Sequence, residues 1–325
     1  MKIGVWLPNF GSWAPIKKST VEFNKLRELA EAADRLGFSS IWVSDHLMNP
    51  AGAKPSGGPV ENRPILEAWT TLSALSTVTR KVKLGNLVLC NQFRIPSLLA
   101  KMGATLDVIS NGRFILNIGV GWFRKEAVAY GIPWREYMDR YKALREAVKV
   151  IKELWTKDVA NFEGEYYTLK NAVLEPKPLS KPHPPIWMGG KSDNILRLVA
   201  EEGDGWDIDV HQNVLSTIKE RVESLKLYCR TIGRRAEEIE ISTHAMALVT
   251  ESEDEALELA KPHAESANLT LKEFSDIHFV GAPKKIIKKI KRYSEVGVTN
   301  LCLLFGNDVE GLMLFADEVL PAIMK

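Results

Sequence analysis

One stretch of the chain decides the predicted fold: Ile41-Trp42-Val43-Ser44-Asp45-His46. Apolar residues with strand propensity lead directly into two titratable side chains, and a loop rich in Pro and Gly follows from Asn49 to Pro64. A buried strand that delivers polar groups to an open end is typical of a (β/α)8 barrel, whose chemistry lies at the C-terminal ends of its strands. Asp45 and His46 are therefore candidate functional residues. For such a pair taken alone, a strand end with a capping Asp and a solvated His is the alternative.

Outward from this stretch, strands and helices alternate along the whole chain. The expected strands are residues 2–8, 38–44, 82–89, 114–118, 185–188, 205–210, 239–250 and 301–305. The expected helices are residues 21–36, 65–80, 96–110, 137–155, 193–202, 214–232, 253–260, 283–295 and 308–320. Parallel strands need crossover connections, and helices supply them.

This alternation predicts an α/β fold, a closed (β/α)8 TIM barrel that forms a single domain over residues 1–325, with insertions after strands 2, 4 and 7. An open Rossmann-type sheet is the runner-up, because Gly119-Val120-Gly121 follows an expected strand. The third glycine of the dinucleotide-binding motif is missing, and the next helix is expected only near Tyr137. The dinucleotide motif is therefore rejected.

Composition narrows the classes of function. The 325 residues are 45% hydrophobic and carry a net charge of +2, which gives no reason to expect nucleic acid as a partner. No apolar run approaches the roughly 20 residues that span a bilayer. No signal-peptide core follows Met1, so a cytoplasmic location is expected. The three cysteines lie far apart and no two histidines have metal-ligand spacing, so neither a metal site nor a disulfide framework is expected.

The residues that follow each strand converge on one mouth if the barrel is correct. They are Asn9, Asp45 and His46, Cys90 and Asn91, Gly119 to Trp122, Gly189 to Ser192, and Asp209 to His211. This mixture suits a flat aromatic cofactor on an apolar wall with a few polar contacts, and Trp122 is placed to flank a planar ligand. Gly189-Gly190-Lys191-Ser192 suits a phosphate, because it exposes N–H groups before a helix and Lys191 adds positive charge. A tight turn with Ser192 as N-cap is the alternative.

An ordered series of short motifs extends over nearly the whole chain. The motifs are Gly37-Phe38 with Ser44-Asp45-His46, Leu84-Gly85-Asn86-Leu87-Val88, Leu98-Leu99-Ala100-Lys101 with Thr105-Leu106-Asp107, Ser110-Asn111-Gly112-Arg113-Phe114, Gly119-Val120-Gly121-Trp122, Pro184-Pro185-Ile186-Trp187-Met188-Gly189-Gly190 and Gly203-Asp204-Gly205-Trp206. No single motif is decisive, but the series in this order is specific. It resembles the luciferase-like flavin and deazaflavin oxidoreductases.

The resemblance implies a TIM barrel, commonly a homodimer, that binds FMN or the deazaflavin F420 at the C-terminal mouth. It implies that His46 lies near the cofactor ring and handles a proton, while Asp45 orients His46 or binds the cofactor. It also implies a non-prolyl cis peptide at Leu87-Val88 that supports the ring. The implied cofactor-binding residues are Asp45, Leu87, Val88, Cys90, Asn91, Gly119, Gly121, Trp122, Lys125, Gly189, Gly190, Lys191 and Ser192.

Three functions follow from this resemblance. The first is an F420-dependent oxidoreductase that passes a hydride to or from a small organic substrate. The second is a monooxygenase that uses reduced FMN (FMNH2) and O2, with a flavin or F420 reductase as an expected partner. The third is a non-catalytic flavin-binding protein.

The identity of the substrate is less constrained. Where sugar-phosphate dehydrogenases of the family carry a Glu, this chain has Trp122, which argues against a glucose-6-phosphate type of substrate. Asn9 and Arg94 are the weaker candidates for substrate contact, Arg94 for an anionic group. The segments 49–64, 162–185 and 261–277 are expected to be loops that shape the substrate pocket.

Overall fold

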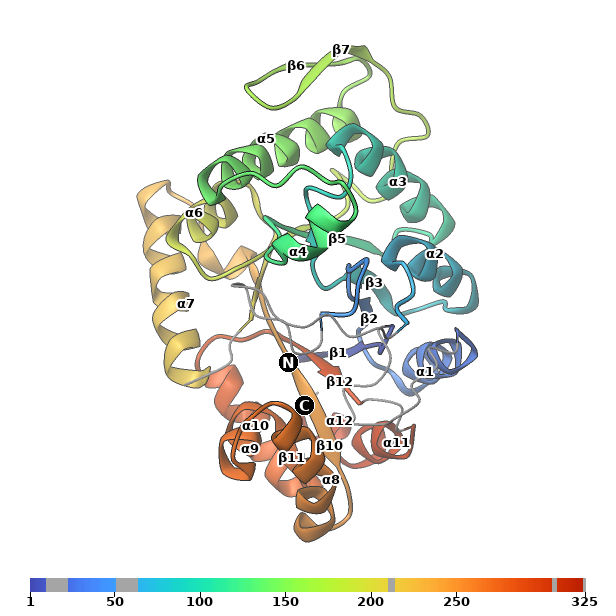
Figure 1. Cartoon of the computed structure of the whole chain (residues 1–325), viewed down its shortest axis with the longest axis vertical. Helices are drawn as coiled ribbons and strands as arrows, with labels where there is room; N and C mark the ends of the chain where they lie inside the picture. Colours follow the sequence, from blue (N-terminus) through green and yellow to red (C-terminus); the bar gives the residue numbers. More distant parts are fainter. Residues whose placement is uncertain (10–22, 51–63, 210–213, 306–308, 324–325) are drawn as a thin grey trace.

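A closed barrel of eight parallel strands forms the centre of the molecule (Figure 1). The computed structural model describes residues 1–9, 23–50, 64–209, 214–305 and 309–323. The barrel strands are β1 (Lys2–Trp6), β2 (Ser40–Val43), β3 (Lys83–Asn86), β5 (Phe114–Gly119), β8 (Ile186–Gly189), β9 (Gly205–Ile208), β10 (Glu240–Val249) and β12 (Asn300–Leu304). Each pairs with the next in chain order, and β12 returns to pair with β1, Lys2 lying opposite Asn300. The predicted TIM barrel is confirmed.

Helices surround the barrel as the alternation predicts (Figure 1). They are α1 (Phe23–Leu36), α2 (Ala68–Val78), α3 (Pro96–Ile109), α5 (Tyr137–Thr156), α6 (Asp193–Glu202), α7 (Val214–Thr231), α10 (Pro283–Glu295), α11 (Val309–Glu318) and the short α12 (Leu320–Ile323). In α1, Leu26, Leu29 and Ala33 recur at helical spacing and are buried against the strands. No helix among the described residues is long and apolar enough to cross a membrane.

Additional elements interrupt the simple repeat in two places. The short helix α4 (Arg124–Ala129) follows β5, and an antiparallel hairpin of β6 (Ala160–Glu163) and β7 (Thr168–Ala172) follows α5. Three elements lie between β10 and α10: α8 (Glu253–Ser266), α9 (Leu271–Ile277) and β11 (Phe279–Gly281). Strand β11 pairs with the C-terminal end of β10 and extends the sheet there. A 3-10 turn, Ala236–Glu238, precedes β10.

The prediction of a loop over 261–277 is wrong. Helix α8 continues through Pro262, because Ala260 and Ala264 on either side of the proline are buried and packing holds the helix together. Thr270 and Glu273 then start α9 with a reciprocal capping box. The expected loop over 49–64 and the expected rim residues 210 and 211 fall largely outside the described residues.

The third barrel strand is broken at its mouth end. Residues 82–89 are predicted as one strand, but the strand ends at Asn86, and a two-residue strand β4 (Leu89–Cys90) resumes beside β5. Between them the Leu87–Val88 peptide bond is cis, as the resemblance implies. The break places Leu87 in the barrel interior and Val88 at the mouth beside Gly119 and Gly189.

The barrel interior is filled mainly by aromatic and other large side chains. Trp42 and Trp187 lie with ring centroids 5.2 Å apart, and both are buried. The neighbouring strands carry Gly85 and Gly205 where these indoles pass: an added Cβ would lie 2.2 Å from Trp42 and 2.3 Å from Trp187. These glycines therefore make room for the two indoles, which close the barrel beneath the mouth.

Candidate active site

The predicted acid/base residue, His46, has a carboxylate partner that sequence analysis missed. Its Nδ1 lies 3.0 Å from Oε2 of Glu126 on helix α4. The other oxygen, Oε1, accepts hydrogen bonds from the backbone N–H groups of Leu47 and Met48, and the Glu126 side chain is only 1% exposed. Since a carboxylate only accepts hydrogen bonds, Nδ1 carries the proton and Nε2 is the nitrogen left for a ligand.

Aromatic rings surround the same histidine. The rings of Trp122 and Phe123 meet the imidazole edge-on, with centroids 5.6 Å and 6.3 Å from it. The Trp122 side chain is 41% exposed, in contrast to the buried Trp187 and Trp206. Trp122 therefore lies at an open surface beside His46, and its role beside a planar ligand stays a prediction.

Asp45 does not contact His46, which corrects the prediction that it orients the imidazole. Its carboxylate binds both ends of the Arg94 guanidinium, at 2.9 Å and 3.0 Å, and accepts a hydrogen bond from the Cys90 N–H at 2.9 Å. The Asp45 side chain is 1% exposed. Asp45 therefore fixes the short strand β4 to the end of β2.

The Arg94 guanidinium is also engaged in contacts within the protein. Besides Asp45, its guanidinium binds Oε1 of Glu67 at 2.6 Å, and its side chain is 11% exposed. Burial opposes the charge on Glu67, but the N–H groups of Thr70 and Trp69 and the nearby guanidinium together lower its pKa. Arg94 is thus a buried structural cation in this geometry, and it is not presented to an anionic substrate.

Asn9 also serves the scaffold. Its amide donates to the carbonyls of Ser44 and Leu66 and accepts from the Ser44 N–H at 2.9 Å. The side chain is fully buried, so the structure does not bring Asn9 to a surface that faces a substrate.

The floor of the mouth is built from the cis bulge and three glycines. A Cβ added at Gly189 would lie 2.7 Å from Val88, and one at Gly119 would lie 3.4 Å from it. Gly121 has a φ of 77°, and a Cβ there would lie 2.6 Å from the Cys90 sulfur. Burial raises the pKa of the Cys90 thiol to about 12, so Cys90 is a neutral, apolar part of this floor.

The predicted phosphate turn lies at the start of helix α6. The Ser192 hydroxyl is the N-cap, accepts from the Ile195 N–H at 3.4 Å and lies 2.6 Å from the Tyr137 hydroxyl. Lys191 is exposed, and Gly190 has a φ of 134°. The turn therefore combines a helix N-terminus, two hydroxyls and an exposed cation, which together suit a phosphate.

Arg140 and Asn91 add buried polar groups beside the floor. Arg140 donates from Nη1 to the carbonyl of Gly121, at 2.5 Å, while its buried Nε has no hydrogen-bond partner among the described residues. The Asn91 amide donates to the Tyr167 hydroxyl at 3.3 Å, and its buried oxygen likewise has no described partner. Lys125, by contrast, lies on the exposed side of α4.

Further residues of this site were also missed from the sequence. Glu126 was overlooked because the next helix was expected only near Tyr137, whereas α4 begins directly after the glycine-rich loop. His244 and Asp207 lie inside expected strands, and alternation along β9 and β10 was the signal that both point inward. Tyr137 and Arg140 start a correctly predicted helix whose N-terminus reaches the mouth.

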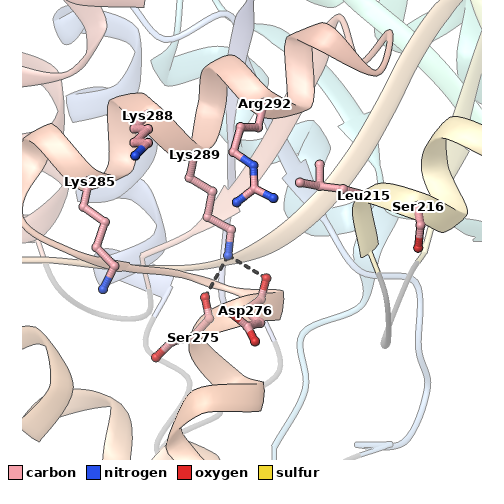
Figure 2. Close-up of a pocket in the computed structure, with 8 residues that line it drawn as sticks. All are labelled: Leu215, Ser216, Ser275, Asp276, Lys285, Lys288, Lys289 and Arg292. Carbon is pink, nitrogen blue, oxygen red and sulfur yellow. Dashed lines mark hydrogen bonds between the residues drawn. The ribbon is translucent and has the colours of Figure 1, made fainter.

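A separate cavity of about 530 Å³ lies between the starts of α7 and α10 and the end of α9 (Figure 2). Figure 2 shows the Lys289 ammonium turned toward the end of α9, where it donates to the carbonyls of Ser275, Asp276 and His278 at 2.6–2.8 Å. Lys285 pairs with Glu253 at 2.7 Å. Lys289 of α10 therefore caps the C-terminus of α9.

Residues 1–300 match the family model described as luciferase-like monooxygenase. The chain belongs to this family. An FMNH(2)-dependent dimethylsulfone monooxygenase of Pseudomonas putida is 26% identical, over all of this chain and 96% of that protein. An F420-dependent glucose-6-phosphate dehydrogenase of Amycolatopsis mediterranei is 29% identical, over 92% of this chain and 94% of that protein. The family thus includes relatives of both cofactor types.

Solved structures show the same fold. An F420-dependent secondary alcohol dehydrogenase in complex with an F420-acetone adduct superposes with a TM-score of 0.81 at 23% identity, covering 99% of this chain and 98% of the other. The monooxygenase RslO1 from Streptomyces bottropensis superposes with a TM-score of 0.82 at 22% identity, covering 99% of each chain. The protein is therefore a TIM-barrel oxidoreductase of the luciferase-like family, and these likenesses do not separate the two cofactor types.

Proposed function

We propose that this protein is an F420-dependent oxidoreductase that transfers a hydride between the deazaflavin and a small organic substrate. The observation that carries the proposal is the largely buried His46–Glu126 pair at the barrel mouth. Because the carboxylate engages Nδ1, the pair supports Nε2 of His46 as the nitrogen that would exchange a proton with a ligand. When bound, the deazaflavin supplies the carbon that gives or takes the hydride.

The residues of the mouth fit such a cofactor. Val88, the glycines 119 and 189 and the neutral Cys90 form an apolar floor without charged groups. Trp122 offers an exposed aromatic wall, and Lys191, Ser192 and the N-terminus of α6 offer a site for the phosphate. The same residues would also hold FMN. They therefore support a flavin-like cofactor in general, and they favour neither F420 nor FMN.

His46 would exchange the proton that accompanies hydride transfer. Glu126 holds the ring by Nδ1 and is itself held by two backbone N–H groups, so Nε2 has a fixed position. The Trp122 and Phe123 rings limit the access of water to the imidazole. With Nδ1 held by the carboxylate, His46 would exchange a proton with a ligand through Nε2.

The alternative is an FMNH2-dependent monooxygenase, and the full-length likeness to the dimethylsulfone monooxygenase supports it. It would need a reductase partner and oxygen. For either activity, we propose one catalytic domain over residues 1–325 that works as a cytoplasmic homodimer. A non-catalytic flavin-binding protein is disfavoured by the His46–Glu126 pair, which a storage protein does not need.

A fluorescence titration with oxidised F420, run beside FMN, tests the proposal. We expect micromolar binding of F420 and much weaker binding of FMN. A Gly189→Val variant, whose side chain would collide with Val88 at the floor, should lose this binding. Binding of FMN alone would move the protein to the monooxygenases.

A further inference from the structure

A second histidine, His244, lies on strand β10 among inward-facing groups. Its Nδ1 lies 3.3 Å from Oδ2 of Asp207, and its Nε2 lies 3.5 Å from Oδ1 of Asp209. The imidazole meets the Trp6 ring edge-on at a centroid distance of 5.3 Å. Cys302 on the neighbouring strand lies opposite His244 in the ladder, and its buried thiol carries no charge.

The charges around this ring make it a cation. Burial disfavours the imidazolium, but Asp207 and Asp209 outweigh that cost and raise the pKa of His244 to about 10. Asp207 is 1% exposed, so it is a fixed neighbour. Asp209 is 52% exposed, and its contact with Nε2 is long for a hydrogen bond. His244 thus has one buried carboxylate neighbour and one exposed carboxylate neighbour.

Contacts between neighbouring strands connect His244 with both ends of the site described above. The Trp6 indole N–H donates to the Ser44 hydroxyl at 2.9 Å, and Ser44 directly precedes Asp45 and His46. On the other side, the Gly190 N–H donates to the Asp207 carbonyl at 3.0 Å. His244 therefore lies within the same rim, between the His46 strand and the phosphate turn.

Its hydrogen bonding is incomplete for a histidine with a purely structural role. The buried Nδ1 makes no well-aligned hydrogen bond with a described residue, and the buried Oδ1 of Asp207 has no described partner. The imidazole is also 16% exposed, the same fraction as His46. Because buried polar groups are usually hydrogen-bonded, this incomplete pairing at the mouth points to a role in ligand binding.

We propose that His244 is a cationic anchor for a substrate oxygen that carries or gains negative charge, which names carbonyl compounds and their alcohols as the substrate class. This inference rests on the proposed function. Nε2–H would donate to the oxygen in place of Asp209, while Asp207 keeps the ring charged. The long contact and the exposed carboxylate make Asp209 the group that a ligand can displace.

In carbonyl reduction, a bound reduced deazaflavin would supply a hydride, with its electron pair, to the substrate carbon, and the π pair of the C=O bond would move onto oxygen. The charge on that oxygen would lie against the imidazolium of His244. His46, in its doubly protonated form, would supply the proton from Nε2 that gives the alcohol. His244 keeps its proton throughout and acts by electrostatic stabilisation.

The test uses isobutyrate, a stable carboxylate, as a probe for the anionic oxygen. Isobutyrate is titrated into protein loaded with oxidised F420, and both the cofactor fluorescence and the imidazole signals of 13C-labelled histidine are followed. We expect saturable binding that shifts the His244 signal. His244→Gln should weaken the binding roughly tenfold, as for loss of one charge-assisted hydrogen bond. Asp209→Asn should instead strengthen it several-fold, because it removes a competing negative charge.

Controls separate this inference from the proposed function and from misfolding. His183→Gln, at a histidine that contacts the Pro184 carbonyl, should bind the probe as wild type does. Asp209→Asn alters an exposed side chain, so its opposite effect cannot come from unfolding. The anchor is overturned if F420 binds normally but isobutyrate shows no saturable binding, or if His244→Gln binds isobutyrate as tightly as wild type does. Either result leaves the proposed function intact. Failure of F420 itself to bind removes the proposed function, and the probe titration on the cofactor-free protein then decides the anchor.

Discussion

The two histidines of the barrel mouth have equal exposure but different neighbours. His46 has one carboxylate partner, Glu126, together with the rings of Trp122 and Phe123, and its Nε2 is left for a ligand. His244 lies between Asp207 and Asp209, which hold it as an imidazolium. Two flanking carboxylates therefore hold His244 as a cation, whereas His46, with a single carboxylate partner, is the histidine that we propose exchanges a proton.

The largest expected effect comes from removing His46, the proposed proton-exchanging histidine. His46→Ala should lower the turnover number roughly 100-fold or more, as expected for loss of a general acid/base, while F420 affinity stays within a few-fold of wild type. Steady-state kinetics and a fluorescence titration measure the two quantities. His183→Ala is the matched control. Full turnover by His46→Ala would remove His46 from the mechanism.

The second prediction concerns the scaffold beneath His46. Asp45→Asn breaks a buried bidentate pair with Arg94 and should lower the free energy of unfolding by roughly 3 kcal/mol. Glu67→Gln changes a carboxylate that is 39% exposed and should cost less than about 1 kcal/mol. Denaturant unfolding of both variants measures the difference. If both variants lost the same free energy of unfolding, the Asp45–Arg94 pair would not be the main stabilising contact of Arg94.

The third prediction uses the charge on His244. Its pKa in the folded protein, about 10, exceeds the usual value near 6.5 of an unfolded chain, so its contribution to stability is complete below that lower value. The contribution is then lost as the pH rises through about 10. His244→Gln should therefore destabilise the protein by roughly 2 kcal/mol at pH 6 and by much less near pH 10. Denaturant unfolding across this range measures it, and a cost independent of pH would contradict the cationic state.

The smallest expected effect is at Cys90, on the floor of the mouth beside Gly121. Because burial raises its pKa to about 12, the thiol should react with a thiol reagent at pH 8 far more slowly than a free cysteine. Cys90→Ala should change F420 affinity less than threefold. Mass spectrometry and the same titration check both. Rapid modification that cofactor binding blocks would assign Cys90 a reactive role.

The fold was predictable because strands and helices alternate clearly and each strand ends in polar or glycine-rich residues. The cis bond at Leu87–Val88 was foreseen only through the resemblance, since no local propensity favours it. Glu126 was missed because a six-residue helix gives almost no periodic signal.

The partners of Asp45 and Arg94 were hidden for a different reason. They are 49 positions apart in sequence and meet only when β2 and the β4 turn are adjacent in the barrel. The prediction that Asp45 orients His46 rested on their adjacency in sequence. The side chains of successive residues in an extended chain, however, point in opposite directions. The same alternation places His244, Ser242 and Met246 together on one face of β10.

The most direct test of the central claim is oxidation of reduced F420 by the protein without oxygen, in the presence of a panel of small ketones, aldehydes and enones. We expect at least one carbonyl compound to restore the absorbance of the oxidised cofactor anaerobically and to be reduced in equal amount, and His46→Ala to slow this reaction roughly 100-fold or more. Oxidation of a reduced cofactor that occurs only when oxygen is admitted, with an oxygenated product, would contradict hydride transfer and place the protein among the monooxygenases.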